Sequence, residues 1–321
     1  MQLRTFDELT PSQDVDRLLV HLSSLGGATN RRSVDLWRRR SDLYSDYAGI
    51  FAVEGGTVVG QTYVKRLPYT FRTGTEPISA IASVGTRPDL ARTGIAGRIL
   101  EEVHRRERAA GLRYAALWTN PSWGAHRLYE KLGYRDVYVF PWAVRGPRPA
   151  RGSGRAPRGI RPARDGDLAE LERLHDRWAE GRLGFCRRPK RLLRTAAEAH
   201  EIDPASEIVV GGSGGRIAGY ASLQANPYRL QCGELVATSA SARAGLLAEL
   251  ERRAKGLPVV VQGSPVVDAG AALRARGYRV LPTGWWVFMA KDLEGPWDPR
   301  TAVETFATDD PRFLCLSGDR F

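Results

Sequence analysis

The chain repeats its own plan, and this duplication constrains the fold more than any other feature. A pattern of apolar strand, glycine turn and second strand at residues 50–60 recurs at residues 208–219. A later series of landmarks also occurs twice with nearly equal spacing: Gly111-Leu112, Asn120-Pro121 and Gly133-Tyr134, then Gly256-Leu257, Ser264-Pro265 and Gly277-Tyr278. We therefore interpret the 321 residues as two tandem domains of one type.

Strand and helix patterns are mixed along the first half. Short apolar runs predict strands at 3–6, 78–85, 114–119 and 136–144 beside a hairpin at 48–66, and apolar spacings of three and four predict helices near 15–22, 34–43, 94–110 and 122–132. This order predicts an α/β (α+β) domain with a mixed central sheet flanked by helices.

A segment rich in Pro, Gly and Arg, residues 146–158, has no hydrophobic period and is interpreted as a basic linker. It separates an N-terminal domain, residues 1–145, from a second domain, residues 159–293. Residues 294–321 form a tail, and its apolar end is expected to pack back on a domain.

The net charge of +12 comes mostly from arginine. Arginine pairs well with phosphates, so the charge suits a polyanion such as coenzyme A or a nucleic acid, and codon bias would also produce it. No apolar run is long enough to cross a bilayer and the N-terminus has no secretory layout, so we expect a cytoplasmic protein with no membrane partner. Cys186, Cys232 and Cys315 are scattered, so neither disulfides nor a metal site is expected.

The first informative stretch runs from Ile81 to Arg98, where a strand gives way to a loop and then a helix. The bare N–H groups of Thr93 to Gly97 would lie at the helix N-terminus, which favours an anion. Gly94 and Gly97 let a phosphate approach the backbone, and Arg87, Arg92 and Arg98 add positive charge. A bare loop-to-helix turn is the alternative interpretation.

The second stretch begins at Asn120 and ends at Gly133-Tyr134. Ala125, Leu128, Tyr129 and Leu132 recur at helical spacing, so Tyr129 points into the domain. It is either a core tyrosine or a phenol that donates a proton to a leaving thiolate.

Together these stretches resemble the signature of the GNAT superfamily of acetyl-CoA-dependent N-acetyltransferases. Its phosphate loop, Q/R-x-x-G-x-G/A, corresponds to residues 91–96, where Ala91 replaces the leading Gln or Arg and Arg92 follows it. Its later helix, N-x-x-A-x-x-x-Y-x-x-x-G-F/Y, is matched closely. The resemblance covers residues 1–145 well.

The resemblance implies an acetyl-CoA-dependent N-acetyltransferase whose N-terminal domain moves an acetyl group to a primary amine by direct attack on the thioester. Tyr129 would be the general acid, and a backbone amide would polarise the acetyl carbonyl. The residues that would bind acetyl-CoA are Val84, Gly85, Thr86, Arg92, Thr93, Gly94, Ile95, Ala96, Gly97 and Asn120.

The second half lacks the residues of both motifs. The counterpart of the phosphate loop, residues 237–242, has neither glycine nor arginine, and Leu273 and Ser264 stand where the first half has Tyr129 and Asn120. This half is similar to the middle domain of the enhanced-intracellular-survival (Eis) type of acetyltransferase, and after Trp297 we expect no room for that family's sterol-carrier-like third domain. In that family the final carboxylate reaches the active site, so Asp319 and Phe321 are possible acceptor-site residues or bases.

The general base and the acceptor stay open. Glu54, Glu76 and Asp46 are carboxylates in the right half, and the neighbours of His126 suggest a surface position. We expect a small-molecule or peptide amine as the partner. The alternatives are a non-catalytic acyl-CoA- or nucleic-acid-binding tandem module, and a mycothiol-synthase-like enzyme that would work through its C-terminal half.

Overall fold

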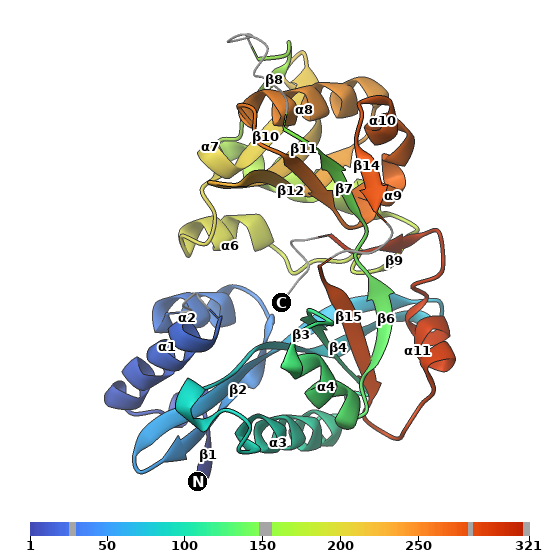
Figure 1. Ribbon diagram of the computed structural model, residues 1–321. Coiled ribbons are helices and arrows are strands. Elements are labelled where there is room, and N and C mark those ends of the chain that lie inside the picture. The colour runs from blue at the N-terminus through green and yellow to red at the C-terminus, as the bar shows by residue number, and fades with distance from the viewer. Residues whose placement is uncertain (26–29, 148–155, 282–284, 317–321) are drawn as a thin grey trace. The chain divides into compact units, whose positions relative to one another are not determined.

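A computed structural model describes residues 1–25, 30–147, 156–281 and 285–316. The chain forms two compact units, each a mixed sheet with helices, which confirms the expected fold class (Figure 1). Among the described residues, unit 1 comprises residues 1–138 and 286–308, and unit 2 comprises residues 139–285 and 309–316. Within the described ranges, no helix is long and apolar enough to cross a membrane.

Unit 1 is built on a sheet with the strand order β1-β2-β3-β4-β5-β15-β6. Its strands are β1 (Gln2–Thr5), β2 (Tyr44–Glu54), β3 (Thr57–Phe71), β4 (Gly74–Thr86), β5 (Tyr114–Thr119), β6 (Arg135–Val139) and β15 (Val287–Asp292). Its helices are α1 (Pro11–Leu25), α2 (Arg31–Arg40), α3 (Ile95–Ala109), α4 (Gly124–Lys131) and α11 (Pro299–Phe306), with short 3-10 turns η1 (Phe6–Glu8) and η2 (Pro88–Leu90).

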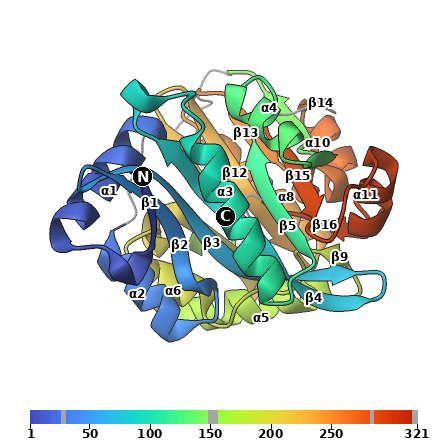
Figure 2. The same cartoon turned by 90° about the horizontal axis from the view of Figure 1, so that it is seen from below.

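Two hydrophobic clusters cover the sheet of unit 1. One joins α3 and α4 to the strands through residues such as Ile99, Val64 and Leu117. The other joins α1, α2 and η1 to the strands through Val20, Val34 and Phe51. Figure 2 shows α3 lying along the strands, with α1 and α2 beside β1 and β2.

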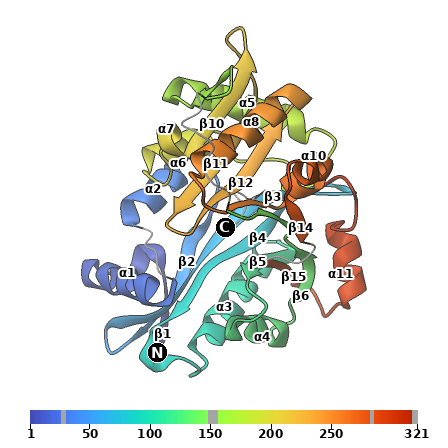
Figure 3. The same ribbon diagram turned by 45° about the horizontal axis from the view of Figure 1, so that its top comes forward.

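Unit 2 repeats the plan on a sheet with the order β14-β7-β13-β12-β11-β10-β8. The strands of this sheet are β7 (Trp142–Arg145), β8 (Ile160–Pro162), β10 (Ile208–Ser213), β11 (Arg216–Asn226), β12 (Arg229–Ala237), β13 (Val259–Gln262) and β14 (Arg279–Leu281). Unit 2 also contains β9 (Leu183–Gly184) and β16 (Phe313–Leu314), which lie outside this order. Its helices are α5 (Leu168–Ala179), α6 (Leu192–Glu198), α7 (Pro204–Glu207), α8 (Ala240–Arg253), α9 (Ser264–Asp268) and α10 (Gly270–Ala275), with one 3-10 turn η3 (Asp165–Asp167). Figure 3 shows α8 along β11 and β12, as α3 lies along its own strands.

The two halves of the sequence exchange strands. The units therefore divide the chain differently from the boundaries expected at residues 145 and 293. The single strand expected at 136–144 breaks at Pro141, which has no N–H to donate to a ladder. Its second part, β7, pairs with β13 and β14 of unit 2. Conversely β15, from the C-terminal half, pairs antiparallel with β5 of unit 1 and lies beside β6 (Figure 1).

The tail also divides between the units. Phe306 of α11 packs in unit 1 against Tyr69, Phe71 and Tyr114, and the Tyr69 hydroxyl donates to the Phe306 carbonyl at 2.5 Å. In unit 2, β16 pairs in parallel with β9. Asp319 and Phe321 lie outside the described residues, as does most of the linker.

Candidate active site

The end of β4 is where the sheet of unit 1 opens. Parallel pairing of β4 with β5 covers residues 79–81 and 115–117, and in the described chain it stops there although β4 continues to Thr86. On the β3 side, Gln61 pairs with Gly85 and Tyr63 with Ala82, so Ser83 and Val84 both oppose one residue. This is a β-bulge, with Ser83 at φ 53°. Backbone groups at Val84 to Thr86 are therefore available to a ligand.

The loop after β4 leads to helix α3, whose N-terminus has no side-chain cap. Gly94, the N-cap of α3, has φ 86° and ψ 0°, a left-handed conformation that favours glycine, and it caps no N–H with a side chain. The first bond within the helix runs from Arg98 N–H to the Gly94 carbonyl at 3.1 Å. The N–H groups of Ile95, Ala96 and Gly97 consequently have no acceptor within the helix.

This helix tip suits an anion electrostatically. The first turn of α3 has no acidic residue, and the side chains of Arg92 and Arg98 are exposed beside it. A Cβ at Gly94 would meet no atom within 4 Å, so the approach to the backbone is open. Arg87, by contrast, is engaged by Asp89 through two bonds of 2.7 and 2.8 Å.

A close approach of helix and sheet holds the tip in place. A Cβ added at Gly60 on β3 would lie 2.6 Å from Ile95 Cγ2 and 3.0 Å from Ile99 Cδ1. Glycine at this position therefore lets the first turn of α3 rest directly on the strand.

Helix α4 carries Tyr129 into the same hydrophobic cluster. Tyr129 is 5% exposed, packs edge-on against Tyr134 at a centroid distance of 5.9 Å, and shares the cluster with Ile95 and, at its edge, Val84. Its hydroxyl has no hydrogen-bond partner among the described residues. Burial raises the pKa of Tyr129, so the phenol stays protonated and can act as an acid.

The end of α4 fixes this tyrosine. Gly133, at φ 90°, terminates the helix, with Gly133 N–H donating to the Glu130 carbonyl and Tyr134 N–H to the Tyr129 carbonyl, both at 3.0 Å. This is a Schellman motif, and it explains the glycine in the sequence pattern. Tyr134 is fully buried, and its hydroxyl oxygen lies 2.8 Å from His104 Nε2.

Asn120 has a structural task that its sequence pattern did not indicate. It is buried, and its Oδ1 accepts from the Ser122 N–H at 2.8 Å and the Ser122 hydroxyl at 2.6 Å. The side chain thereby orders the turn between β5 and α4. Its amide nitrogen stays available for the expected contact with pantetheine.

The three carboxylates considered as bases are all exposed. Glu76 is exposed and seven residues before Ser83, roughly 23 Å along the strand. Glu54 and Asp46 are also exposed, and Asp46 lies 3.5 Å from Arg66. His126, expected at the surface, is instead largely buried, because Asp136 at 2.9 Å and Glu130 at 3.6 Å hold its ring.

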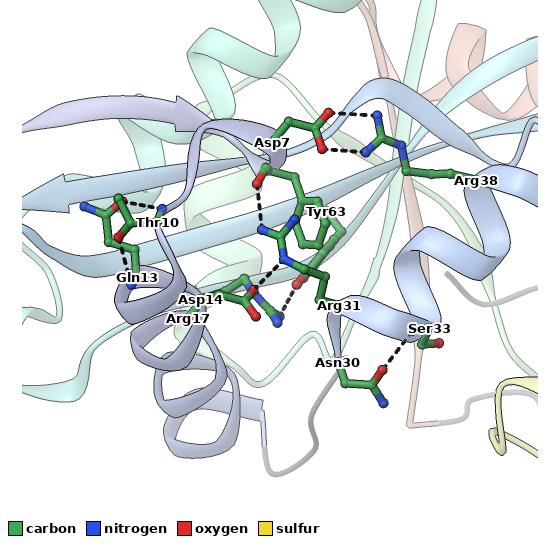
Figure 4. A network of polar contacts seen from close by, with 11 residues as sticks. Asp7, Thr10, Gln13, Asp14, Arg17, Asn30, Arg31, Ser33, Arg38 and Tyr63 are labelled. Carbon is green, nitrogen blue, oxygen red and sulfur yellow. Dashed lines mark hydrogen bonds and ion pairs between the residues drawn. The ribbon is translucent and has the colours of Figure 1, made fainter.

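A network of buried polar side chains between α1 and the sheet was missed by sequence reasoning (Figure 4). Arg17 is completely buried; its Nε donates to Asp14 at 2.9 Å, and its Nη1 donates to the Tyr63 hydroxyl. Arg31 of α2 approaches the same Asp14 at 3.7 Å. The available signal was the set of polar residues at spacings of four and three along α1.

A cavity of about 550 Å³ lies on the α1 side of unit 1. Its lining residues are mostly apolar: Leu19, Val20, Leu22, Val58 and Pro88, with Asp16, Ser23, Thr57 and Arg87. Val20 also lies 3.8 Å from a Cβ built at Gly85, so this cavity adjoins the open end of β4.

In unit 2 the corresponding helix tip is closed. The N-cap of α8 is Ser239, whose hydroxyl accepts from the Ala242 N–H at 3.2 Å. Leu273, at the place of Tyr129, is fully buried in the core of the unit. The three cysteines form no disulfide with one another and are buried, all in this unit.

Part of the chain matches a known family model. Residues 10–137 match the family model described as an acetyltransferase (GNAT) domain. A search of curated proteins found no match.

Several solved structures share the fold over most of the chain. A GCN5-related N-acetyltransferase from Kribbella flavida is 22% identical with a TM-score of 0.59, covering 90% of this chain and 70% of that one. Eis1 from Mycobacterium abscessus is 16% identical with a TM-score of 0.56, covering 92% and 74%. A putative acetyltransferase from Pyrococcus horikoshii is 14% identical with a TM-score of 0.54, covering 98% and 94%. The chain therefore shares the fold of these solved structures, and its residues 10–137 are similar to a GNAT acetyltransferase domain.

Proposed function

We propose that unit 1 transfers an acetyl group from acetyl-CoA to a primary amine. The observation that carries this proposal is the bare helix tip at Gly94, directly after a strand that has parted from its parallel neighbour. The GNAT domain match over the same residues supports it.

The residues fit acetyl-CoA at each part of the molecule. The N–H groups of Ile95 to Gly97, with Arg92, would bind the diphosphate. The free backbone of Val84 to Thr86 would pair with the pantetheine amides, and the Asn120 amide would bond to its thioester end. Arg92 compensates for Ala91, which has no side-chain contact to offer.

The reaction needs one proton removed from nitrogen and one given to sulfur. The amine attacks the thioester carbonyl carbon, the C–N bond forms, and the C–S bond breaks. Tyr129, buried and protonated, would donate its hydroxyl proton to the departing sulfur. We place the acceptor beside Gly85 at the open end of β4, next to the apolar cavity on the α1 side.

We propose a non-catalytic role for unit 2. Its helix tip is occupied by its own serine and its tyrosine position by a buried leucine, so a diphosphate would have to displace a formed cap.

Calorimetry with acetyl-CoA, followed by an amine screen that detects free thiol, tests the proposal on the full chain. Saturable binding that Gly94→Leu removes, with amine-dependent thiol release, is expected. Binding that Gly94→Leu leaves intact would move the cofactor elsewhere. Absence of acetyl-CoA binding with salt-sensitive nucleic-acid binding would favour a binding module instead.

A further inference from the structure

Helix α1 of unit 1 is inverted relative to an ordinary surface helix. Its side chains Val15, Leu19 and Leu22 are 56%, 59% and 51% exposed, whereas Arg17 and His21 are buried against the sheet. Amphipathic helices normally bury the apolar stripe, because burying polar groups is costly unless they are hydrogen-bonded. The buried polar side chains of α1 therefore need hydrogen-bond partners.

The N-terminal part of this polar face is hydrogen-bonded to the rest of the unit. Gln13 accepts from the Arg4 side chain at 3.0 Å and donates to the Gly56 carbonyl at 3.0 Å. Arg17, one turn later, is held by Asp14 and Tyr63 (Figure 4). These residues anchor the helix.

One turn further along α1, His21 and its neighbour Gln61 each have a polar atom without a hydrogen-bond partner among the described residues. His21 Nδ1 lies 3.1 Å from Gln61 Nε2, and among the described residues His21 Nε2 has no hydrogen-bond partner. Gln61 Oε1 is buried and also has none within the described chain. His21 as a whole residue is 7% exposed.

The side chains of His21 and Gln61 belong to residues beside the open end of β4. Gln61 is directly paired with Gly85, the residue that follows the bulge. Ser24, three residues after His21, would lie 2.3 Å from a Cβ at Gly85. Since α1 rises 1.5 Å per residue, His21 is about 5 Å along the helix from that contact.

The charge state of the ring suits proton acceptance. Burial, and then the positive charge of Arg17, lower the pKa of His21, so its imidazole is neutral near pH 7. The other groups facing it are Tyr63, with its ring centroid 6.3 Å away, and the uncharged Gln61. With the Gln61 amide as placed, its nitrogen donates to Nδ1 and the ring hydrogen is on Nε2. Turning the amide by 180° presents its oxygen instead, so that Nδ1 carries the hydrogen and Nε2 has a free lone pair.

We propose that His21 is the proton acceptor of the transfer reaction, oriented by Gln61. This inference rests on the proposed function. As the amine nitrogen bonds to the acetyl carbon, its proton passes to His21 Nε2, directly or through one water, while Tyr129 protonates the sulfur. His21 then releases its proton to solvent and Tyr129 regains one, so a single proton has moved from nitrogen to sulfur.

The test compares His21→Gln with His126→Gln in the full chain. His126 is a matched control, because it is also a largely buried histidine of unit 1 with polar partners. We expect kcat/KM to fall about 100-fold or more in His21→Gln, with the acetyl-CoA Kd within twofold of wild type, and to stay within twofold in His126→Gln. The acidic limb of the wild-type pH profile should vanish in His21→Gln alone.

Gln61→Leu is the second variant, in case His21→Gln does not fold. It should lower kcat about tenfold while the pH profile keeps its acidic limb at a shifted position. Unchanged turnover in both variants overturns the role of His21 and leaves the proposed function standing, whereas a wild-type chain that never binds acetyl-CoA fails the proposed function itself. If a chain ending at Gly318 loses the acidic limb and His21→Gln keeps it, the acceptor belongs to the tail.

Discussion

Gly94 and Gly111 flank α3 and provide a controlled test of the phosphate site. Their φ angles are nearly equal, 86° and 83°, and at neither would an added Cβ meet an atom within 4 Å. Gly94 precedes the bare helix tip, whereas Gly111 follows the helix end. Replacing each with leucine therefore introduces the same backbone strain at opposite ends of one helix.

The magnitudes separate the two effects. A left-handed conformation costs a non-glycine residue about 1–2 kcal/mol, so both variants should lose that much stability. At Gly94 the side chain would also obstruct the N–H groups of Ile95 to Gly97. Losing two charge-assisted hydrogen bonds of about 1.5–3 kcal/mol each weakens binding about 100-fold or more, since 1.4 kcal/mol is tenfold.

Urea denaturation measures the stability of each variant, and calorimetry measures its affinity for acetyl-CoA. Equal stability losses with affinity lost only in Gly94→Leu are expected. If Gly111→Leu loses affinity to the same extent, the effect is general destabilisation, and the diphosphate does not bind at Gly94.

Three further predictions concern single side chains. Tyr129→Phe should lower kcat about 100-fold with an unchanged Kd for acetyl-CoA, because only the proton donor is removed; equal kcat would exclude the phenol as the acid. Gly60→Ala should lower the free energy of unfolding by about 1–3 kcal/mol, because the added methyl group would overpack Ile95. Gly124→Ala, where an added Cβ meets nothing within 4 Å, should lower it by nothing. Urea denaturation measures both losses, and equal losses would contradict the packing argument. His175 is 1% exposed, and burial, followed by the charge of Arg188, lowers its pKa to about 3. Below about pH 6.5, His175 binds a proton in the unfolded chain, whereas in the folded chain it stays neutral down to about pH 3. The folded state therefore loses stability as the pH falls through this window. His175→Leu should remove about 1 kcal/mol of the loss between pH 6 and pH 5, measured by urea denaturation; the same loss in both proteins would show that His175 is not the cause.

Elements with strong local signals could be predicted from the sequence. The helix tip at Gly94 and the Schellman end at Gly133 follow from glycine positions, because few other residues adopt these conformations. The spacing of Val15, Leu19 and Leu22 predicted α1 as a helix. It did not reveal that this stripe is exposed, since periodicity identifies a face and tertiary packing decides which face is buried.

Partner choice could not be read from the strands. β7 and β15 have ordinary apolar patterns that fit either sheet, so the exchange between the units required the structure. His21 and Gln61 are 40 positions apart and have no motif around them. Only the fold brings such a pair together at the end of β4.

The exchanged strand β15 has a consequence for biosynthesis. Met289 and Val287 belong to the hydrophobic cluster around Tyr129, and they emerge from the ribosome only when most of the chain has been made. The sheet of unit 1 stays incomplete between β5 and β6 until a segment synthesised almost 150 residues later than β6 has emerged. Premature termination anywhere in the second half would thus disable the first half too, and stalled nascent chains should be the species most in need of chaperones.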